Sequence, residues 1–381
     1  MKVVIAIDSF KGSVSSLEAG EAAKNGVLDV YPDADVSVMP LADGGEGTVE
    51  TLVYGLGGEM VNTDVTGPMG EKINCSYGII NGTAVMEMAA SSGLPLVPIE
   101  KRNPLLATTY GVGDMIKDAV NRGCRDFIIG IGGSATNDGG MGMLQSLGVR
   151  FVDENGKETG IGGKYLADIR DVDISGLMPE LKECAFNIAC DVDNPLCGER
   201  GASRVYGPQK GASENDIKFL DSALGNFSKI TKKKLGVDCA ETPGSGAAGG
   251  LGYGFMAYLG AILKPGVEIV LDAIGIDSIL DGADYVITGE GRIDSQTAMG
   301  KAPAGVAKRA KNAGAAVIGI AGCVTDDAYL CNSEGIDAIF PVIDKAMPIE
   351  EAMDRSVTVK NIRKEVKQIF RLISIAGKEK Q

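Results

Sequence analysis

The chain contains neither histidine nor tryptophan among its 381 residues. The absence of histidine excludes Ser-His-Asp and Cys-His catalysis, histidine metal sites and histidine as a general base. Any catalytic base must therefore be Asp, Glu, Lys, Tyr or Cys. No run of about 18 apolar residues occurs either, so a transmembrane helix is not expected.

Cysteine is present, but never in the Cys-x-x-Cys spacing of a zinc ribbon or a thioredoxin motif. The eight cysteines are scattered over the chain, at positions 75, 124, 184, 190, 197, 239, 323 and 331. The first ten residues, MKVVIAIDSF, become polar too early for a signal sequence and resemble a first strand. We therefore expect reduced, mostly buried thiols in a cytoplasmic protein.

Positive charge is also scarce, and the formal net charge is −14. Basic stretches occur only at Lys232–Lys234 and from Lys360 to Lys380. An acidic protein without a basic stripe is a poor binder of nucleic acid or of membrane surfaces, so small-molecule partners are expected. Solubility is the simplest explanation of the acidic balance.

The length and the pattern of apolar segments predict an α/β protein of two domains. Both ends alternate strand and helix, whereas the middle begins with short strands and an Asn81–Gly82 turn typical of a hairpin. We expect one flavodoxin-like or Rossmann-like domain, residues 1–60 and 270–381, with a parallel sheet built from both chain ends. Residues 61–269 would form an inserted domain of mixed sheet, with boundaries placed to about 15 residues or more.

Particular elements follow from the same pattern. Ser15 or Ser16 should cap a helix that runs to about Val30. The segment GSGAAGGLGYG should open a helix reaching about Leu263, and the chain from Pro348 should be helical to its end. Strands are expected at residues 3–7, 36–40, 127–131, 186–190, 283–288, 316–321 and 338–342, and further helices at 111–122, 214–233 and 301–313.

The most informative stretch runs from Phe127 to Gly140, where a buried strand leads into GIGGSATNDGG. Glycines at a strand end expose backbone N–H groups that can cradle phosphate. We expect Gly132 and Gly133 to contact nucleotide, Ser134 and Asn137 to contact substrate, and Asp138 to hold Mg²⁺.

A second loop of this type follows the strand near Tyr285, in the sequence YVITGEGRIDSQTAMGK. Arg292 can bind a carboxylate or phosphate in bidentate fashion, and Lys301 precedes a helix start that attracts anions. The expected roles are nucleotide binding for Gly289, Gly291 and Lys301, substrate binding for Arg292, and metal binding for Glu290 and Asp294.

Acids also follow three other predicted strands. Asp8 comes directly after the first strand, with Lys11 in the same loop, and Asp43 lies in ADGGEGT before a helix. Asp191 is the first residue after the strand that ends at Cys190. We expect catalytic roles for Asp8 and Lys11, substrate or metal contact for Asp43, and a general base in Asp191. Each acid is also a reasonable turn former or helix-terminal charge.

Two common nucleotide motifs are missing. No segment matches the P-loop consensus GxxxxGK[ST]. Gly244, Gly246 and Gly249 have the spacing of a dinucleotide-binding turn, but no clear strand precedes them and no acid follows about 20 residues later. Nicotinamide binding is therefore not expected.

Taken together, seven segments resemble the glycerate kinase type I family, the bacterial glycerate 2-kinases. They occur in order along nearly the whole chain: DSFKGS (8–13), ADGGEGT (42–48), GIGGSATNDGG (130–140), ACDVDNPLCGERGAS (189–203), GPQKGA (207–212), GSGAAGGLGYG (244–254) and ITGEGRIDSQT…GK (287–301). The resemblance implies two α/β domains with the site in a cleft, and transfer of phosphate from ATP, with Mg²⁺, to the 2-hydroxyl of D-glycerate. The products would be 2-phosphoglycerate and ADP.

Some alternatives stay open at this point. The phosphoryl acceptor could be the 3-hydroxyl. A Mg²⁺-dependent phosphatase or a non-catalytic nucleotide-binding protein would also be rich in Asp–Gly loops. The sequence does not determine the oligomeric state, and a homodimer is one option.

Overall fold

The computed structural model describes residues 1–378 and divides them into two compact units. Unit 1 comprises Met1–Asp43, Tyr54–Gly57 and the chain from Val267, and unit 2 comprises Gly44–Val53 and Gly58–Gly266. Among the described residues, no helix is long and apolar enough to cross a membrane.

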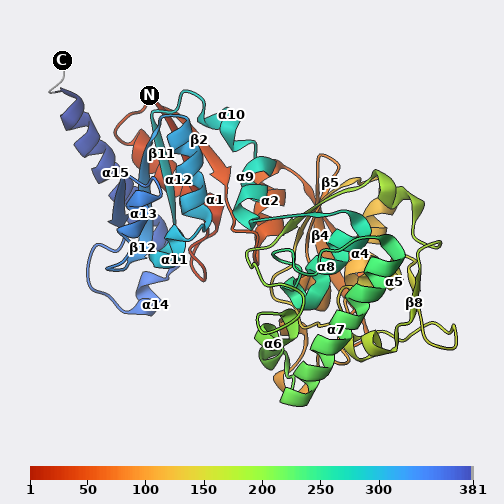
Figure 1. Cartoon of the computed structure of the whole chain (residues 1–381). Helices are drawn as coiled ribbons and strands as arrows, with labels where there is room; N and C mark the ends of the chain where they lie inside the picture. The colour runs from red at the N-terminus through yellow and green to blue at the C-terminus, as the bar shows by residue number, and fades with distance from the viewer. Residues whose placement is uncertain (379–381) are drawn as a thin grey trace. The chain divides into compact units, whose positions relative to one another are not determined.

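Unit 1 contains a five-stranded sheet in the order β13-β12-β11-β1-β2, in which every neighbouring pair is parallel. Red and blue ribbons, the colours of the two chain ends, share this sheet in Figure 1. The finding confirms the predicted parallel sheet built from both ends. Its elements are β1 (Lys2–Ile7), α1 (Ser16–Leu28), β2 (Asp35–Pro40), α9 (Gly266–Ala273), α10 (Ile276–Leu280), β11 (Tyr285–Ile293), α11 (Ser295–Ala298), α12 (Ala302–Asn312), β12 (Ala316–Val324), α13 (Leu330–Ser333), β13 (Ala338–Pro341), α14 (Ile349–Ala352) and α15 (Arg355–Lys378).

The strand order of unit 1 is that of flavodoxin-like folds, with the first strand between the second and the third of the unit. In such sheets ligands bind outside the carboxyl ends of the strands where the order reverses. Here that point lies between β1 and β11, which pair from Val3↔Tyr285 to Ile7↔Gly289. The topology therefore directs attention to the residues that follow Ile7 and Gly289.

Local sequence explains how unit 1 is built. β1 is apolar on both faces because it is fully buried. Ser15 caps α1 in a capping box with Glu18, as the sequence predicts. α1 packs closely on α15, because a Cβ atom at Gly26 would lie 2.7 Å from the carbonyl oxygen of Arg363. The C-terminal part of the chain thus covers the first helix.

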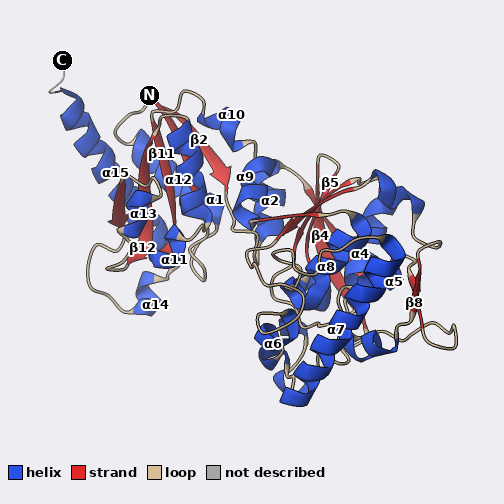
Figure 2. Cartoon of the chain, viewed as in Figure 1, coloured by secondary structure: helices blue, strands red, loops and turns tan. Residues whose placement is uncertain are grey.

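Unit 2 contains a six-stranded sheet in the order β10-β9-β6-β5-β4-β3. Pairs among β10, β9, β6 and β5 are parallel, and pairs among β5, β4 and β3 are antiparallel, which confirms the predicted mixed sheet. Figure 2 shows the helices around it. The elements of unit 2 are β3 (Glu59–Thr66), β4 (Lys72–Ile80), β5 (Thr83–Glu87), α3 (Ala89–Ser92), α4 (Tyr110–Asn121), β6 (Asp126–Gly130), α5 (Met141–Ser146), β7 (Arg150–Val152), β8 (Asp171–Asp173), β9 (Ala185–Ala189), α6 (Ala202–Tyr206), α7 (Glu214–Leu235), α8 (Ala247–Leu259) and β10 (Ile262–Lys264).

The predicted hairpin of unit 2 is confirmed. β4 and β5 are antiparallel, with Ile80 opposite Thr83. Asn81 and Gly82 have φ angles of 48° and 84°. Two positive φ angles in a two-residue loop are characteristic of a type I′ turn, which favours Asn-Gly.

The helix α2 (Thr48–Leu56) begins in unit 2. The division after Asp43 therefore falls inside the stretch 1–60 that the sequence assigns to one domain. The contacts of α2 with β4 and β5 explain this division. A Cβ atom at Gly78 would lie 2.2 Å from the Val53 side chain, and the Val49 N–H donates to Glu87 at 3.1 Å. The start of α2 thus belongs to the core beside β4 and β5.

Two predicted helices end differently in the structure. The helix expected to reach Leu263 ends at Leu259, because Gly260 adopts the left-handed conformation of a helix C-terminus, and Leu263 lies in β10. The helix expected from Pro348 onward is two helices. Asp354 interrupts it by accepting hydrogen bonds from the N–H groups of Ser356 and Val357, at 2.9 and 3.1 Å.

Candidate active site

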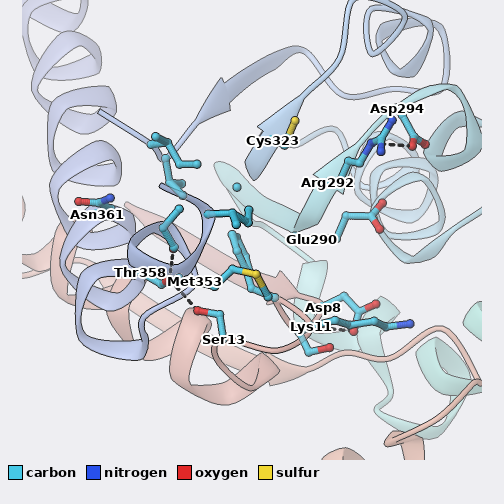
Figure 3. Close-up of a pocket in the computed structure, with 18 of the residues that line it drawn as sticks. Asp8, Lys11, Ser13, Glu290, Arg292, Asp294, Cys323, Met353, Thr358 and Asn361 are labelled. Carbon is cyan, nitrogen blue, oxygen red and sulfur yellow. Dashed lines mark hydrogen bonds and ion pairs between the residues drawn. The ribbon is translucent and has the colours of Figure 1, made fainter. Parts of the chain in front are cut away.

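Unit 1 has a pocket of about 540 Å³ that is lined on one side by residues near the carboxyl ends of β1 and β11. Many of the predicted site residues of this unit meet here. They are Asp8, Lys11, Asp43, Glu290, Gly291, Arg292, Asp294 and Lys301. Figure 3 shows Glu290, Arg292 and Asp294 on one side of the pocket, with Asp8 and Lys11 nearby.

Asp8 is the most buried acid of this pocket, with an exposed fraction of 7%. Its N–H donates to the Gly289 carbonyl at 2.8 Å, and its Oδ1 accepts from the Ser9 N–H at 2.7 Å. Burial, and next the charge of Asp43, raise the pKa of Asp8 to about 7. Such a shift marks a carboxylate that the fold holds in an unfavourable environment, as functional sites often do.

Glu290 faces the same pocket. Its Oε1 accepts from the Thr297 hydroxyl at 2.7 Å, and its Oε2 lies 3.9 Å from Lys301 Nζ. Burial raises the pKa of Glu290. Lys301 is the N-cap residue of α12. Lys301 therefore lies at the start of α12, beside the Glu290 carboxylate.

Two other acids have partners within unit 1. Asp294 caps α11, where its Oδ1 accepts from the Gln296 N–H at 2.9 Å and its Oδ2 lies 3.2 Å from Arg292 Nε. Lys11 Nζ lies 3.8 Å from Asp43 Oδ2, and its side chain is largely exposed. The pocket thus contains several carboxylates and only exposed or half-exposed cations.

Gly289 and Gly291 lie in strand, although the sequence suggested a loop after residue 288. β11 continues to Ile293, with Gly289 opposite Ile320 and Glu290 opposite Ala321 of β12. A Cβ atom at Gly289 would lie 2.1 Å from the Ile320 carbonyl oxygen. At least Gly289 is therefore needed for close strand packing, a different requirement from the predicted phosphate cradle.

In unit 2, the Asp138 side chain is fully buried, and its carboxylate oxygens are hydrogen-bonded to other residues of the protein. It accepts hydrogen bonds from the Thr109 N–H and hydroxyl, at 2.8 and 2.9 Å, and from the N–H groups of Gly140 and Gly142, at 3.1 and 3.2 Å. Burial raises its pKa, while these hydrogen bonds oppose the rise. Asp138 therefore ties the loop to the start of α4.

The other predicted residues of this loop lie in different environments. Gly132 and Gly133 are exposed, and Gly133 has a φ angle of 71°. Ser134 is buried and accepts a hydrogen bond from Lys210. Asn137 is buried, and its Nδ2 donates to Ser203 Oγ at 2.9 Å. Only the first two residues of the predicted cradle reach the surface.

Lys210 was not singled out from the sequence, although the motif GPQKGA contains it. Its exposed fraction is 1%, and its Nζ donates to Ser134 Oγ at 2.7 Å and to the Thr136 carbonyl at 2.6 Å. Burial lowers the pKa of Lys210 to about 7. The local sequence carried no signal of its burial, since lysines in turns are usually solvated.

Asp191 follows β9, as predicted, and is exposed. Its Oδ1 accepts from the Gly266 N–H at 2.9 Å. Asp193, two residues on, is exposed and paired with Arg200 at 2.7 Å. The first acid after the strand thus bonds to the Gly266 backbone, and the second pairs with a side chain of its own loop.

The glycine-rich segment that includes the start of α8 does not form a dinucleotide-binding turn. Ala248, Gly249 and Gly250 adopt left-handed conformations in succession. The Gly139 N–H donates to the Gly249 carbonyl at 3.0 Å, and a Cβ atom at Gly249 would lie 2.1 Å from the Thr136 oxygen. The segment instead supports the buried part of the 132–140 loop.

Comparison with known proteins identifies the family to which the chain belongs. The model of the glycerate kinase family matches residues 3–374. The chain belongs to the glycerate kinase family. The resemblance inferred from the seven segments is thereby confirmed, and the chain is an enzyme of a kinase family, which implies that it uses ATP.

Individual relatives support the same family. The chain is 51% identical to the protein named glycerate 2-kinase from Escherichia coli K12, over 92% of this chain and 93% of that one. It is 50% identical to a glycerate kinase from Bacillus subtilis 168, over 93% and 94% of the two chains. A crystal structure described as glycerate kinase 2 from Salmonella typhimurium LT2 matches with a TM-score of 0.91 and 46% identity, covering 99% of each chain.

Proposed function

We propose that this glycerate kinase family member transfers the γ-phosphoryl group of ATP to the 2-hydroxyl of D-glycerate, giving 2-phosphoglycerate and ADP. The name of the Escherichia coli relative, at 51% identity, supports the position of transfer. The observation in the fold that carries the proposal is the grouping of the desolvated carboxylates Asp8 and Glu290 with Lys11 and Lys301 at the β1/β11 switch point.

Charge neutralisation is what phosphoryl transfer chiefly requires of a protein. Lys11 and Lys301 line the pocket with their ammonium groups near acids, 3.8 Å from Asp43 and 3.9 Å from Glu290. Phosphate oxygens entering the pocket would compete for these cations. We assign both lysines to binding the transferred group.

The carboxylates of the pocket fit a divalent cation. Asp43 and Glu290 each raise the pKa of Asp8, and Asp294 and Asp43 raise that of Glu290, because like charges repel. A bound Mg²⁺ would relieve this repulsion and neutralise phosphate oxygens. Within residues 1–378 no group of three or more acids, cysteines or histidines is arranged to hold a metal by itself. Mg²⁺ commonly takes only one or two carboxylates, with phosphate and water completing its shell.

The structure changes which acids we propose as ligands. Asp138 already accepts hydrogen bonds from Thr109, Gly140 and Gly142, and Asp294 caps α11. We therefore favour Glu290 and Asp8 over the earlier candidates Asp138 and Asp294.

The base assignment of Asp191 and the substrate contacts of Ser134 and Asn137 stay predictions. If Asp191 accepts the hydroxyl proton, Asp191→Asn should lower kcat about 100-fold or more, since general bases contribute roughly 10²–10⁴. Steady-state kinetics with Asp193→Asn as control measures this, because Asp193 lies in the same loop and is paired with Arg200. A near-normal kcat for Asp191→Asn would remove the assignment.

Product analysis tests the proposed reaction. Purified protein with ATP, Mg²⁺ and D-glycerate should give a 2-phosphoglycerate signal in ³¹P NMR only when all three are present. A 3-phosphoglycerate signal would keep the reaction class and move the acceptor position. Release of phosphate from phosphoglycerate without ATP would favour a phosphatase, and ATP binding without ADP formation would favour a binding protein.

We also propose a cytoplasmic location, because all eight cysteines are free thiols. A homodimer stays a prediction, which light scattering of the purified protein tests directly. Binding of nucleic acid is not expected from the charge of the chain.

A further inference from the structure

The unit 1 pocket has an apolar end that the proposed chemistry does not use. Besides the carboxylates, the pocket is lined by Phe10, Val342, Ile349 and Met353. These residues come from the loop after β1, the segment after β13, and α14 with the turn that follows it. Figure 3 shows Met353, Thr358 and Asn361 on the side of the pocket away from Arg292 and Asp294.

One polar side chain at this end lacks a partner. Asn361 lines the pocket from α15 and has an exposed fraction of 6%. Within residues 1–378 no hydrogen bond involves its amide group, whereas the neighbouring Thr358 hydroxyl bonds with Ser13 Oγ at 2.6 Å and with the Ala352 carbonyl at 3.1 Å. The residue is buried as a whole, but its amide atoms are not among the enclosed unpartnered atoms of the described residues, so they reach the pocket. The amide of Asn361 offers one acceptor and two donors to a ligand in the pocket.

The volume and the apolar lining of the pocket indicate which class of ligand it binds. D-Glycerate carries an oxygen on every carbon, so apolar walls contribute nothing to its recognition. A volume of about 540 Å³ lies within the range of sites for drug-sized molecules and cofactors, which are largely apolar with a few placed polar groups. A purine ring is flat and apolar on its faces and polar at its edge. Asparagine pairs with the adenine edge through two hydrogen bonds, one to the amino group and one to a ring nitrogen.

We propose that the apolar end of this pocket binds the adenine ring of ATP and that Asn361 recognises its edge. The ring lies among Phe10, Ile349 and Met353, and the phosphates extend toward Lys11 and Lys301 at the carboxylate end of the same pocket. The inference rests on the proposed function only in taking ATP as the phosphoryl donor. It adds the residues that select the base.

Calorimetric binding without glycerate tests the inference apart from catalysis. Asn361→Ala should weaken ATP binding about tenfold, the usual effect of losing hydrogen bonds to a neutral group. Inosine triphosphate, which lacks the 6-amino group, should bind the wild type more weakly than ATP, and the preference should shrink in Asn361→Ala. Asn25→Ala is the matched control, because Asn25 is exposed on α1 and its side chain donates to the Glu21 carbonyl, at 2.8 Å. An unchanged preference for ATP in Asn361→Ala would overturn the inference.

Photolabelling of the wild-type protein keeps the test independent of the variant's folding. Illumination with 8-azido-ATP should label residues in the stretch 342–361, and excess ATP should prevent labelling. Label confined to unit 2 would overturn the inference.

The two proposals fail in distinguishable ways. ATP binding that depends on Asn361, without phosphorylation of glycerate, would refute the proposed function and keep the inference. Normal turnover with an unchanged KM for ATP, or with a raised KM for glycerate alone, in Asn361→Ala would refute the inference and keep the function.

Discussion

The loop after β1 and the loop after β6 have the same kind of sequence, an apolar strand followed by glycines, hydroxyl side chains and an acid. Asp8 in the first loop lines an open pocket and accepts one backbone hydrogen bond, from Ser9. Asp138 in the second is fully buried and accepts hydrogen bonds from Thr109, Gly140 and Gly142. One acid is available to a ligand, and the other holds its own loop together.

The cations of the two regions differ in the same way. Lys11 is largely exposed and can turn toward an incoming anion. Lys210 is buried, and its ammonium group is committed to Ser134 and Thr136. A strand–glycine–acid pattern therefore indicates a demanding backbone geometry, which a ligand site and a buried loop anchor both require.

The largest expected effect is on stability, in Asp138→Ala. The change leaves the N–H groups of Thr109, Gly140 and Gly142 buried without an acceptor, so we expect a loss of about 3–5 kcal/mol in the free energy of unfolding. Urea denaturation measures it. Asp153→Ala is the control, because Asp153 also accepts two backbone hydrogen bonds, at 2.8 and 2.9 Å, but is only half-buried. Equal losses in both variants would contradict the contrast between the loops.

Asp8→Asn should affect activity more than folding. We expect kcat/KM to fall about 100-fold, the order found when one electrostatic contact to a reacting group is removed. Since the pKa of Asp8 is raised to about 7, the native state holds its proton more tightly than the unfolded state, and Asp8 makes the wild type less stable as pH rises from about 4 to 7.

The stability part of this prediction is measured by thermal unfolding in EDTA. Asp8→Asn should melt above the wild type at pH 8, and the difference should vanish near pH 4. Asp33→Asn, at an exposed turn residue, should show neither effect. A melting difference that does not depend on pH would show that Asp8 is not held at a raised pKa.

The smallest expected effect is that of Lys210→Met, which keeps the length of the side chain. Ser134 Oγ and the Thr136 carbonyl lose a donor, so we expect a loss of about 1–2 kcal/mol at pH 8. Because the pKa of Lys210 is lowered to about 7, the unfolded state binds its proton more tightly, and Lys210 makes the wild type more stable as pH rises from about 7 to 10.

Denaturation at several pH values tests whether the contribution of Lys210 to stability rises with pH. The deficit of Lys210→Met relative to the wild type should grow between pH 7 and pH 9.5. Lys229→Met, at an exposed position on α7, should show no such dependence. A deficit that is constant over this range would mean that Lys210 keeps an ordinary pKa in the fold.

The site was predicted in part. The sequence placed Asp8 and Glu290 after strands and Lys301 before a helix, and because β1 and β11 are parallel neighbours, Asp8 and Glu290 meet at one edge of the sheet, where Lys301 lines the same pocket. It missed Lys210 and Asn361, since nothing in their local sequence distinguishes a buried lysine or asparagine from a solvated one. The two helix ends near Leu259 and Asp354 were also missed, because a single residue stops each helix.

By itself the sequence determined what depends on neighbouring residues. The alternation of strand and helix, the Asn81–Gly82 turn and the capping box of Ser15 and Glu18 are local, so their backbone preferences act before distant segments meet. Only the tertiary structure decided which acid is exposed to a pocket and which is enclosed. Burial depends on segments far apart in the chain: Thr109 and α4 enclose Asp138, and β11 and the C-terminal segments leave Asp8 and Asn361 beside a cavity. Desolvation and partner choice are properties of that assembly, so no local pattern contains them.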